Sequence, residues 1–343
     1  MSGDNILQDS PSSPLRDSFG REIHYLRLSV TDRCNLRCRY CRVDNSFIPH
    51  ERIMRYEEME KLVNLLVPLG VGKVRLTGGE PFVRKGFPEF LTRLRTAHPE
   101  LDLRLTTNGV MLAPHAQLLK ELGVRVNLSL DSLKPQRFAS VTGRDLLPRV
   151  LEALDALQHH DVPLKINAVA MRGVNDDELP DFLALAAERG LDVRFIEFMP
   201  MGEGTLWSDS TYWPAREILE TAGKLVKLGP AVNNSALDGP ATMYPILGTR
   251  GRFGLITPLS CHFCATCNRL RLTSDGRLRT CLFDDREYAL LPLLRRTDIP
   301  EERRLELVRR IVEKAVTRKP VGADILAKRR NEVARRTMTS IGG

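Results

Sequence analysis

Residues 22–41, EIHYLRLSVTDRCNLRCRYC, join a predicted first strand at 23–30 to three closely spaced cysteines. Five more strand-like segments follow, and amphipathic helical patterns that end in Gly separate them; these strands are expected at 73–77, 101–106, 124–130, 164–170 and 192–198. Such alternation predicts right-handed βαβ units and a parallel sheet. Six units are too few for a standard eight-fold barrel. An incomplete (β/α)6 TIM-like barrel and a doubly wound sheet both fit the periodicity.

Polar or otherwise unusual residues recur where the predicted strands end. The cysteines follow the first strand, GGEP at 78–81 follows the second, and TTNG at 106–109 follows the third. Ser129 and Asp131 end the fourth strand, and MPM at 199–201 follows the sixth. Because parallel α/β folds assemble their active sites at the carboxyl ends of their strands, this pattern favours the barrel and predicts a site at its rim.

The composition is that of an ordinary globular protein. Of 343 residues, 42% are hydrophobic and 27% are charged, which excludes a mainly disordered chain. No apolar run is long enough to span a bilayer, and residues 1–20 are polar, so we expect a disordered leader and a cytoplasmic protein without membrane association. The net charge is +8, and residues 295–343 hold most of the excess. Without a base-reading motif, this basic tail predicts a solvated helix rather than nucleic-acid binding.

Seven cysteines in a presumed cytoplasmic chain do not predict a disulfide framework, because thiols stay reduced there. They form two groups that favour two metal sites. Cys34, Cys38 and Cys41 offer three thiolates without a nearby fourth, which suits a 4Fe–4S cluster with one open iron. Zinc with a distant fourth ligand stays an alternative.

The second group, Cys261, Cys264, Cys267 and Cys281, allows three interpretations. All four could close a zinc site. The first three mimic a ferredoxin-like run, with Cys281 as a further ligand. Alternatively, the last three hold a 4Fe–4S cluster. Around this group, the sequence predicts short strands within 230–257, a hairpin turn at 274–276 and a helix over 303–314.

The motif CNLRCRYC resembles the CxxxCxxC signature of the radical S-adenosylmethionine (SAM) superfamily, and GGEP resembles its glycine-rich segment. The resemblance extends over residues 21–343 to the GTP 3′,8-cyclase (MoaA) family of molybdenum-cofactor biosynthesis. It rests on an ordered set of motifs: RLSVTDRCNLRCRYC, VRLTGGEP, TTNG, NLSLDSL, FIEFMPMGEG, FCATCNRLRLTSDGRLRTCLF and the terminal Gly-Gly.

The resemblance implies a radical SAM partial barrel at 21–228 and a C-terminal iron–sulfur extension at 229–343, which carries the basic tail. It implies two 4Fe–4S clusters, with SAM as the source of a 5′-deoxyadenosyl radical that abstracts hydrogen from GTP. The product would be (8S)-3′,8-cyclo-7,8-dihydroguanosine 5′-triphosphate, the first intermediate of molybdopterin synthesis. The implied partners are GTP, an external electron donor and a downstream cyclic pyranopterin monophosphate synthase, and a homodimer is a further expectation.

The family's site residues map onto this chain position by position. The first cluster takes Cys34, Cys38 and Cys41, and the second takes Cys264, Cys267 and Cys281, which leaves Cys261 as a spare thiol. The expected SAM contacts are Tyr40, Gly79, Ser129 and Met199, with Gly79 letting the backbone approach the SAM amino group. The expected GTP contacts are Arg27, Arg75, Thr106, Lys165, Arg269, Leu270 and Arg271. Arg269, Arg271 and the terminal Gly342 and Gly343 join the cluster cysteines as catalytic candidates.

Elementary electrostatics supports the GTP assignment. Arg27, Arg75 and Lys165 lie within predicted strands, where a cation facing inward is costly to bury without a negative partner. An anionic ligand inside the barrel would supply that partner.

Two other classes of protein share part of this pattern. A peptide-modifying radical SAM enzyme with an auxiliary cluster would share the first motif, but we expect it to lack the NRLRL segment and the terminal Gly-Gly. A zinc protein that binds nucleic acid through its basic tail would be colourless and would bind in a salt-dependent way.

Overall fold

The computed structural model describes residues 13–41, 47–201, 205–233 and 239–328. Its strands form one sheet in the order β12-β11-β10-β1-β2-β3-β4-β5-β6-β9-β8-β7. The central six strands are parallel and follow one another along the chain: β1 (Tyr25–Ser29), β2 (Lys73–Thr77), β3 (Asp102–Thr107), β4 (Arg125–Ser129), β5 (Leu164–Ala170) and β6 (Asp192–Glu197). All six predicted strands are confirmed, with ends that differ by at most two residues.

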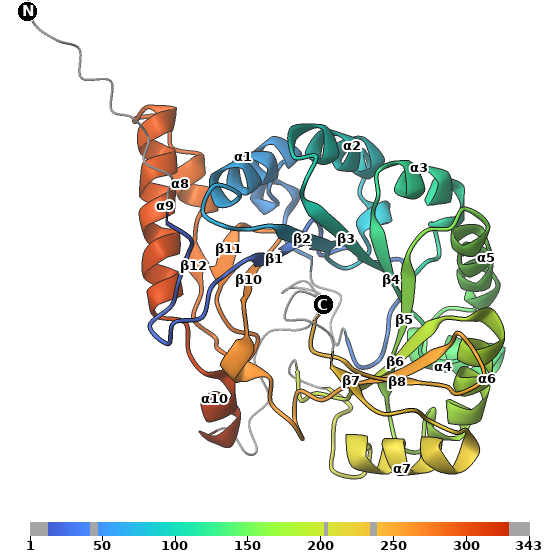
Figure 1. The fold of residues 1–343 in the computed structure, drawn as a ribbon. Coiled ribbons are helices and arrows are strands. Elements are labelled where there is room, and N and C mark those ends of the chain that lie inside the picture. Colours follow the sequence, from blue (N-terminus) through green and yellow to red (C-terminus); the bar gives the residue numbers. More distant parts are fainter. Residues whose placement is uncertain (1–12, 42–46, 202–204, 234–238, 329–343) are drawn as a thin grey trace, which may run out of the picture.

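The helices that connect these strands lie on the outer side of the curved sheet (Figure 1). They are α1 (Tyr56–Leu66), α2 (Phe87–Ala97), α3 (Ala116–Glu121), α4 (Pro135–Thr142), α5 (Leu147–His159) and α6 (Leu179–Arg189). The short 3-10 helices are His50–Arg52, Pro81–Val83, Ala113–His115, Asp176–Glu178 and Cys264–Thr266. The fold is the incomplete (β/α)6 barrel, and the doubly wound alternative is excluded because the helices surround the sheet on one side.

Residues beyond 229 add strands to both edges of the parallel sheet. β9 (Arg252–Ile256) pairs parallel to β6, and β10 (Arg269–Leu272) pairs parallel to β1. The strands β7 (Val232–Asn233), β8 (Thr242–Pro245), β11 (Arg277–Arg279) and β12 (Tyr288–Ala289) then extend the two edges in antiparallel fashion. The predicted hairpin around 274–276 is the β10–β11 pair. The division of the chain at residues 228 and 229 stays a prediction.

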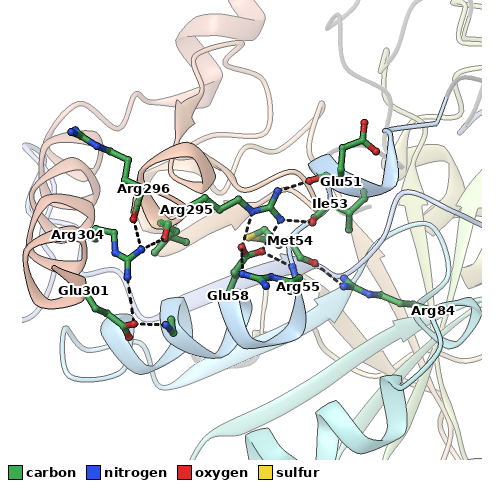
Figure 2. A network of polar contacts seen from close by, with 12 residues as sticks. Glu51, Ile53, Met54, Arg55, Glu58, Arg84, Arg295, Arg296, Glu301 and Arg304 are labelled. Carbon is green, nitrogen blue, oxygen red and sulfur yellow. Dashed lines mark hydrogen bonds and ion pairs between the residues drawn. The ribbon is translucent and has the colours of Figure 1, made fainter. Parts of the chain in front are cut away.

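The remaining helices are α7 (Ala215–Leu225), α8 (Leu291–Leu294), α9 (Glu301–Thr317) and α10 (Gly322–Lys328). The predicted helix over 303–314 is thus confirmed and is longer at both ends. Arg295 joins this C-terminal part to α1 (Figure 2). Its guanidinium donates to both carboxylate oxygens of Glu58, at 2.7 and 2.9 Å, and to the Ile53 carbonyl at 2.9 Å.

The alternation of side chains along β1 separates the core from the interior of the barrel. Leu26 and Leu28 are fully buried between the sheet and the helices. Tyr25 and Arg27 therefore point to the opposite, inner side, because successive side chains of a strand face opposite ways. The same alternation repeats along the other central strands and lines the inside of the barrel with polar side chains.

The expected disordered leader needs a correction. Residues 13–20, which the sequence analysis included in it, pack against the barrel: Leu15 is buried, and its amide donates to the Leu69 carbonyl at 2.9 Å. The buried Asp17 carboxylate forms an ion pair with Arg21 at 2.6 Å. The sequence signal was misleading because these few apolar and charged side chains are ordered by contacts with other segments of the chain, which a local pattern does not reveal. Within the described ranges, none of the helices combines the length and apolar character that crossing a membrane requires.

Candidate active site

A cavity of about 280 Å³ lies inside the curve of the sheet, and β1 to β6, β9 and β10 all contribute side chains to it. It gathers most residues that the sequence analysis singled out: Arg27, Cys34, Cys38, Tyr40, Cys41, Arg75, Gly79, Thr106, Ser129, Met199, Arg269 and Arg271. The expectation that the strand ends converge on one site is therefore met for these residues. What each of them binds stays a prediction at this point.

The loop that carries the first three cysteines is fixed on α4. The amides of Arg37 and Arg39 donate to the carbonyls of Thr142 and Val141, at 2.8 and 3.0 Å. Two further donors face the Cys34 sulfur, namely the Leu36 amide at 3.4 Å and the Asn108 side-chain amide at 3.5 Å. Such donors stabilise the negative charge of a thiolate that binds iron.

The donor set fits an iron–sulfur cluster. Cys34, Cys38 and Cys41 line one wall of the cavity, and all three are only partly exposed. Among the described residues, no three His, Cys, Asp or Glu side chains are grouped so as to hold a metal ion. A cubane cluster carries iron at alternate corners, so its cysteine ligands stand farther apart than the ligands of one ion. Burial raises the pKa of the Cys38 thiol, and neighbouring Cys41 raises it further.

The glycines of the GGEP segment have a packing role, and the expected contact of Gly79 with SAM stays a prediction. A Cβ on Gly79 would lie 2.2 Å from the Arg33 carbonyl oxygen, and a Cβ on Gly78 would lie 2.3 Å from that of Thr31. The amides of Gly79 and Glu80 donate to these same two carbonyls, each at 2.8 Å. Glycine is therefore required for close packing of this segment against the cysteine loop, whereas the sequence argument invoked only an approach to SAM.

Glu80 organises the adjacent strand ends from a fully buried position. Its carboxylate accepts hydrogen bonds from the Phe82 amide at 3.2 Å, the Thr107 hydroxyl at 2.9 Å and the Asn108 amide at 2.7 Å. Burial raises the pKa of Glu80 to about 7, although these hydrogen bonds oppose the shift. Since Asn108 also contacts the Cys34 sulfur, Glu80 connects the second and third strand ends to the first cysteine.

Asp131 is a residue that the sequence analysis noticed at a strand end without giving it a function. The Tyr40 hydroxyl donates to its carboxylate at 2.6 Å, and the Val169 amide donates to the other oxygen at 2.8 Å. Burial raises the pKa of Tyr40, and the Asp131 carboxylate raises it further. Asp131 thereby fixes the ring of Tyr40 at the wall of the cavity.

The lining of the cavity is also strongly basic. We call Arg27, Arg75, Arg194, Arg269 and Arg271 the arginine group; all five line the cavity. Burial lowers the pKa of Arg271 to about 10, and the charge of Arg269 contributes to the shift. Burial also lowers the pKa of Arg27, with Arg271 as the next cause. These buried cations repel one another, so an anion would relieve the cost of burying them.

Tyr25 lies among these cations and was not singled out by the sequence analysis. The Arg75 Nε donates to its hydroxyl at 2.6 Å, and the Arg269 guanidinium carbon lies 5.7 Å from the centre of its ring. Burial alone would raise the pKa of Tyr25, but Arg75, Arg27 and Arg269 outweigh it and bring the pKa down to about 7.

Arg194 was missed as well, and it provides the clearest sign of an absent ligand. It is 5% exposed, and its Nε donates to the Asn167 side chain at 2.9 Å. Its Nη2 is buried and has no hydrogen-bond partner in the described part of the chain. Lys73 and Arg104 also line the cavity, and burial lowers the pKa of Lys73 to about 8. Their position on inward faces of predicted strands was the available signal, since the same argument selected Arg27 and Arg75.

Two predicted GTP contacts do not line this cavity in the described structure. Lys165 lies on the inner face of β5, but its Nζ is 3.3 Å from the Asp192 carboxylate. The side chain of Leu270 is fully buried in the core outside the barrel, because it alternates with the inward-facing Arg269 and Arg271.

The second cysteine group lies beside the first cavity. Cys264, Cys267 and Cys281 line a small adjoining cavity, and Phe263, Leu282 and the two arginines of β10 belong to both. Cys261 is exposed and does not line either of the two. The predicted catalytic residues Gly342 and Gly343 lie outside the described residues.

Family models match both parts of the chain. Residues 28–186 match the Radical SAM superfamily model, and residues 191–325 match the model described as Molybdenum Cofactor Synthesis C. The proteins named GTP 3′,8-cyclase from Alkaliphilus oremlandii and Pelotomaculum thermopropionicum are 39% and 43% identical to this chain. Both alignments cover 96% of this chain and 100% of the relative.

Solved structures support the fold independently. The crystal structure of Streptococcus suis SuiB superposes with a TM-score of 0.61 over 82% of this chain and 64% of that chain, at 15% identity. At this identity the likeness concerns the fold alone.

A barrel with three cysteines at its rim and a match to the superfamily model over its first half define a radical SAM enzyme, which uses a 4Fe–4S cluster and SAM. The full-length relatives narrow this class. The chain belongs to the GTP 3′,8-cyclase family of molybdenum-cofactor biosynthesis.

Proposed function

We propose that this enzyme converts GTP into (8S)-3′,8-cyclo-7,8-dihydroguanosine 5′-triphosphate inside the cavity between its two cysteine groups. The observation that carries the proposal is the unpartnered Nη2 of Arg194, which is buried at a cavity that the arginine group and the three cysteines line together. A buried guanidinium with a free donor needs an acceptor, and a triphosphate supplies several.

The arginine group, Lys73 and Thr106 bind the substrate. The Arg75 Nη1 donates to the Thr106 hydroxyl at 3.3 Å and to the Leu105 carbonyl at 3.2 Å, so these groups are already oriented before the substrate enters. Lys165 joins them once its ion pair with Asp192 yields to phosphate, and Leu270 contributes only by holding Arg269 and Arg271 on one face. Preorganised cations stabilise a polyanion without paying for their own ordering at the moment of binding.

The first cysteine group holds a 4Fe–4S cluster, and Tyr40, Gly79, Ser129 and Met199 surround SAM. When bound, these groups supply an electron and a 5′-deoxyadenosyl radical. The chain's own residues orient and shield the reaction: Asp131 fixes Tyr40, and Glu80 and Asn108 keep the Cys34 sulfur facing the cavity.

Cys264, Cys267 and Cys281 hold a second 4Fe–4S cluster, with Cys261 outside the ligand set. The support for this assignment is that the three share one cavity, whose wall includes Arg269 and Arg271, while Cys261 is exposed. The guanine of GTP would then lie at the second cluster, and the phosphates would lie among the arginines. Gly342 and Gly343 take part in the cyclisation step of this proposal.

The proposal extends to the cellular setting of the enzyme. The enzyme works in the cytoplasm, receives electrons from an external donor and passes its product to a cyclic pyranopterin monophosphate synthase, and it forms a homodimer.

Anaerobic reconstitution tests the function directly. Enzyme with iron, sulfide, SAM, dithionite and GTP should form 5′-deoxyadenosine and the cyclised nucleotide together. Deleting Gly342 and Gly343 should preserve 5′-deoxyadenosine but stop cyclisation. If the intact enzyme did not cyclise GTP, and instead formed 5′-deoxyadenosine while it modified a peptide, the assignment of GTP as substrate would be contradicted.

A further inference from the structure

The segment that follows α9 packs directly against the second cysteine group. A Cβ on Gly322 would lie 3.0 Å from the Cys281 sulfur and 3.3 Å from the Cys264 sulfur. The backbone amides of Gly322 and Ala323 donate to the Cys264 sulfur. Residues 319–323 therefore form part of the immediate surroundings of this site, although no local sequence motif connects them with the cysteines.

Lys319 is the buried cation of this segment. Its side chain is 2% exposed, and its ammonium donates to the Arg269 carbonyl at 2.8 Å and to the Thr280 carbonyl. It also hydrogen bonds with the Cys267 sulfur. Arg269 lies two residues after Cys267, and Thr280 directly precedes Cys281, so one ammonium group links the two halves of the cysteine site.

The charge of Lys319 has an unusual set of neighbours. The groups of opposite charge that face it are Cys267 and Cys281, and no carboxylate of the described chain forms an ion pair with it. Arg21, the other cation beside the site, differs because the buried Asp17 carboxylate neutralises it at 2.6 Å. A buried ammonium without a carboxylate needs another negative partner. The thiolates of an iron-bound cysteine site would provide it.

Arg21 has a separate, structural role. Its Nη1 donates to the Cys264 carbonyl at 2.7 Å, and its Nη2 donates to the carbonyls of Lys319 and Pro320, at 3.3 and 3.1 Å. It thus holds the backbone of residues 319–320 against the cysteine loop. This contact fixes the position of Lys319 without adding net charge.

We propose that Lys319 is a positioning residue of the second cysteine site, which acts as the counter-cation of its thiolates and raises the reduction potential of the cluster bound there. This inference rests on the second cluster of the proposed function. A positive charge beside the sulfurs stabilises the reduced cluster more than the oxidised one, because reduction adds negative charge.

The test uses the full chain with Cys34, Cys38 and Cys41 replaced by Ala, so that only the second cluster remains. Lys319→Met should lower the midpoint potential in a redox titration followed by electron paramagnetic resonance, and Lys319→Arg should restore most of the shift. Arg318→Met is the matched control, since it removes a charge from the exposed neighbouring residue and should leave the potential unchanged. Equal potentials in Lys319→Met and Arg318→Met would overturn the inference.

A second comparison covers loss of the cluster. If Lys319→Met binds no iron, Lys319→Arg and Lys319→Gln are compared by iron and sulfide content. Retention in the Arg variant with loss in the Gln variant supports the role of charge, and loss in both contradicts it. If the parent chain with the three alanines binds no iron, the proposed second cluster is refuted. That outcome differs from equal potentials in two variants that both hold the cluster, which refutes only the role of Lys319.

Discussion

The α-carbon of Gly79 faces the carbonyl oxygen of Arg33 so closely that no side chain fits between them. The amide of the next residue, Glu80, donates to the same carbonyl at 2.8 Å. One contact between a glycine and a backbone oxygen therefore aligns the GGEP segment with the loop of the first three cysteines, one residue before Cys34.

We expect Gly79→Ala to disturb the cysteine loop rather than only the binding of SAM. Overpacking of this kind costs about 2 kcal/mol, so the free energy of unfolding should fall by at least that amount. Iron content after reconstitution should fall as well. Anaerobic urea unfolding and an iron assay would measure the two effects. Gly72→Ala is the control, because an added Cβ there meets no atom within 4 Å. Unchanged stability and iron content together with weaker SAM binding would show that Gly79 acts only through its contact with SAM.

The two cysteine groups should lose iron independently. Cys38→Ala should abolish formation of 5′-deoxyadenosine, and Cys281→Ala should remove about half of the iron if each cluster holds four. Cys261→Ala should lose little, because this thiol is exposed and lies outside the cavity of the other three. Iron assays and product chromatography on the three variants measure this. If Cys261→Ala emptied the second site, the ferredoxin-like ligand set would replace ours.

Arg194→Met should weaken GTP binding without affecting the clusters. Removal of a charge-assisted hydrogen bond costs about 2 kcal/mol, which corresponds to a rise of about thirtyfold in Kd. Equilibrium dialysis with labelled GTP would measure it, and 5′-deoxyadenosine formation without GTP should stay at the parent level. Arg216→Met is the control, because its side chain is 85% exposed on α7. Equal affinities in the two variants would show that the free Nη2 does not bind substrate.

Tyr25 predicts a pH dependence of GTP binding. The fold lowers its pKa from 10.0 to about 7, so the phenol ionises as pH rises from 6 to 8 and its negative charge opposes the triphosphate. The Kd of GTP should therefore rise by up to about tenfold over this range. Tyr25→Phe should remove most of this rise, and comparison of the two proteins cancels the titration of GTP itself. An identical rise in both proteins would mean that Tyr25 does not couple to the substrate.

The same shift has a consequence for the stability of the substrate-free enzyme. Because the folded pKa is lower than the unfolded one, ionised Tyr25 stabilises the fold fully above pH 10, and this contribution disappears as pH falls through 7. Tyr25→Phe should lack that pH-dependent part of the free energy of unfolding.

Local patterns made the barrel predictable. Along β1, Leu26 and Leu28 alternate with Tyr25 and Arg27, so strand and inner face follow from a period of two residues. The motif of the three cysteines at 34, 38 and 41 was predictable for a similar reason, because it depends only on their local spacing.

Other parts of the site depend on contacts between distant segments. Arg194 becomes informative only because β5 places Asn167 beside it and leaves Nη2 without a partner. Lys319 follows the last cysteine by many residues, and the packing of α9 brings its ammonium to the carbonyl of Thr280, the residue before that cysteine. The packed residues 13–20 were missed for the same reason.

The connection between β9 and β10 has a mechanical consequence. β9 extends one edge of the parallel sheet and β10 extends the other, so the chain between Ile256 and Arg269 ties the two sides of an open barrel together by covalent bonds. That tether carries Cys264 and Cys267, and Cys281 follows the neighbouring hairpin. A rigid group bonded to all three cysteines would limit the opening motions of the barrel. Occupancy of this site would then slow amide hydrogen exchange on both sides of the barrel, in β1 and in β6.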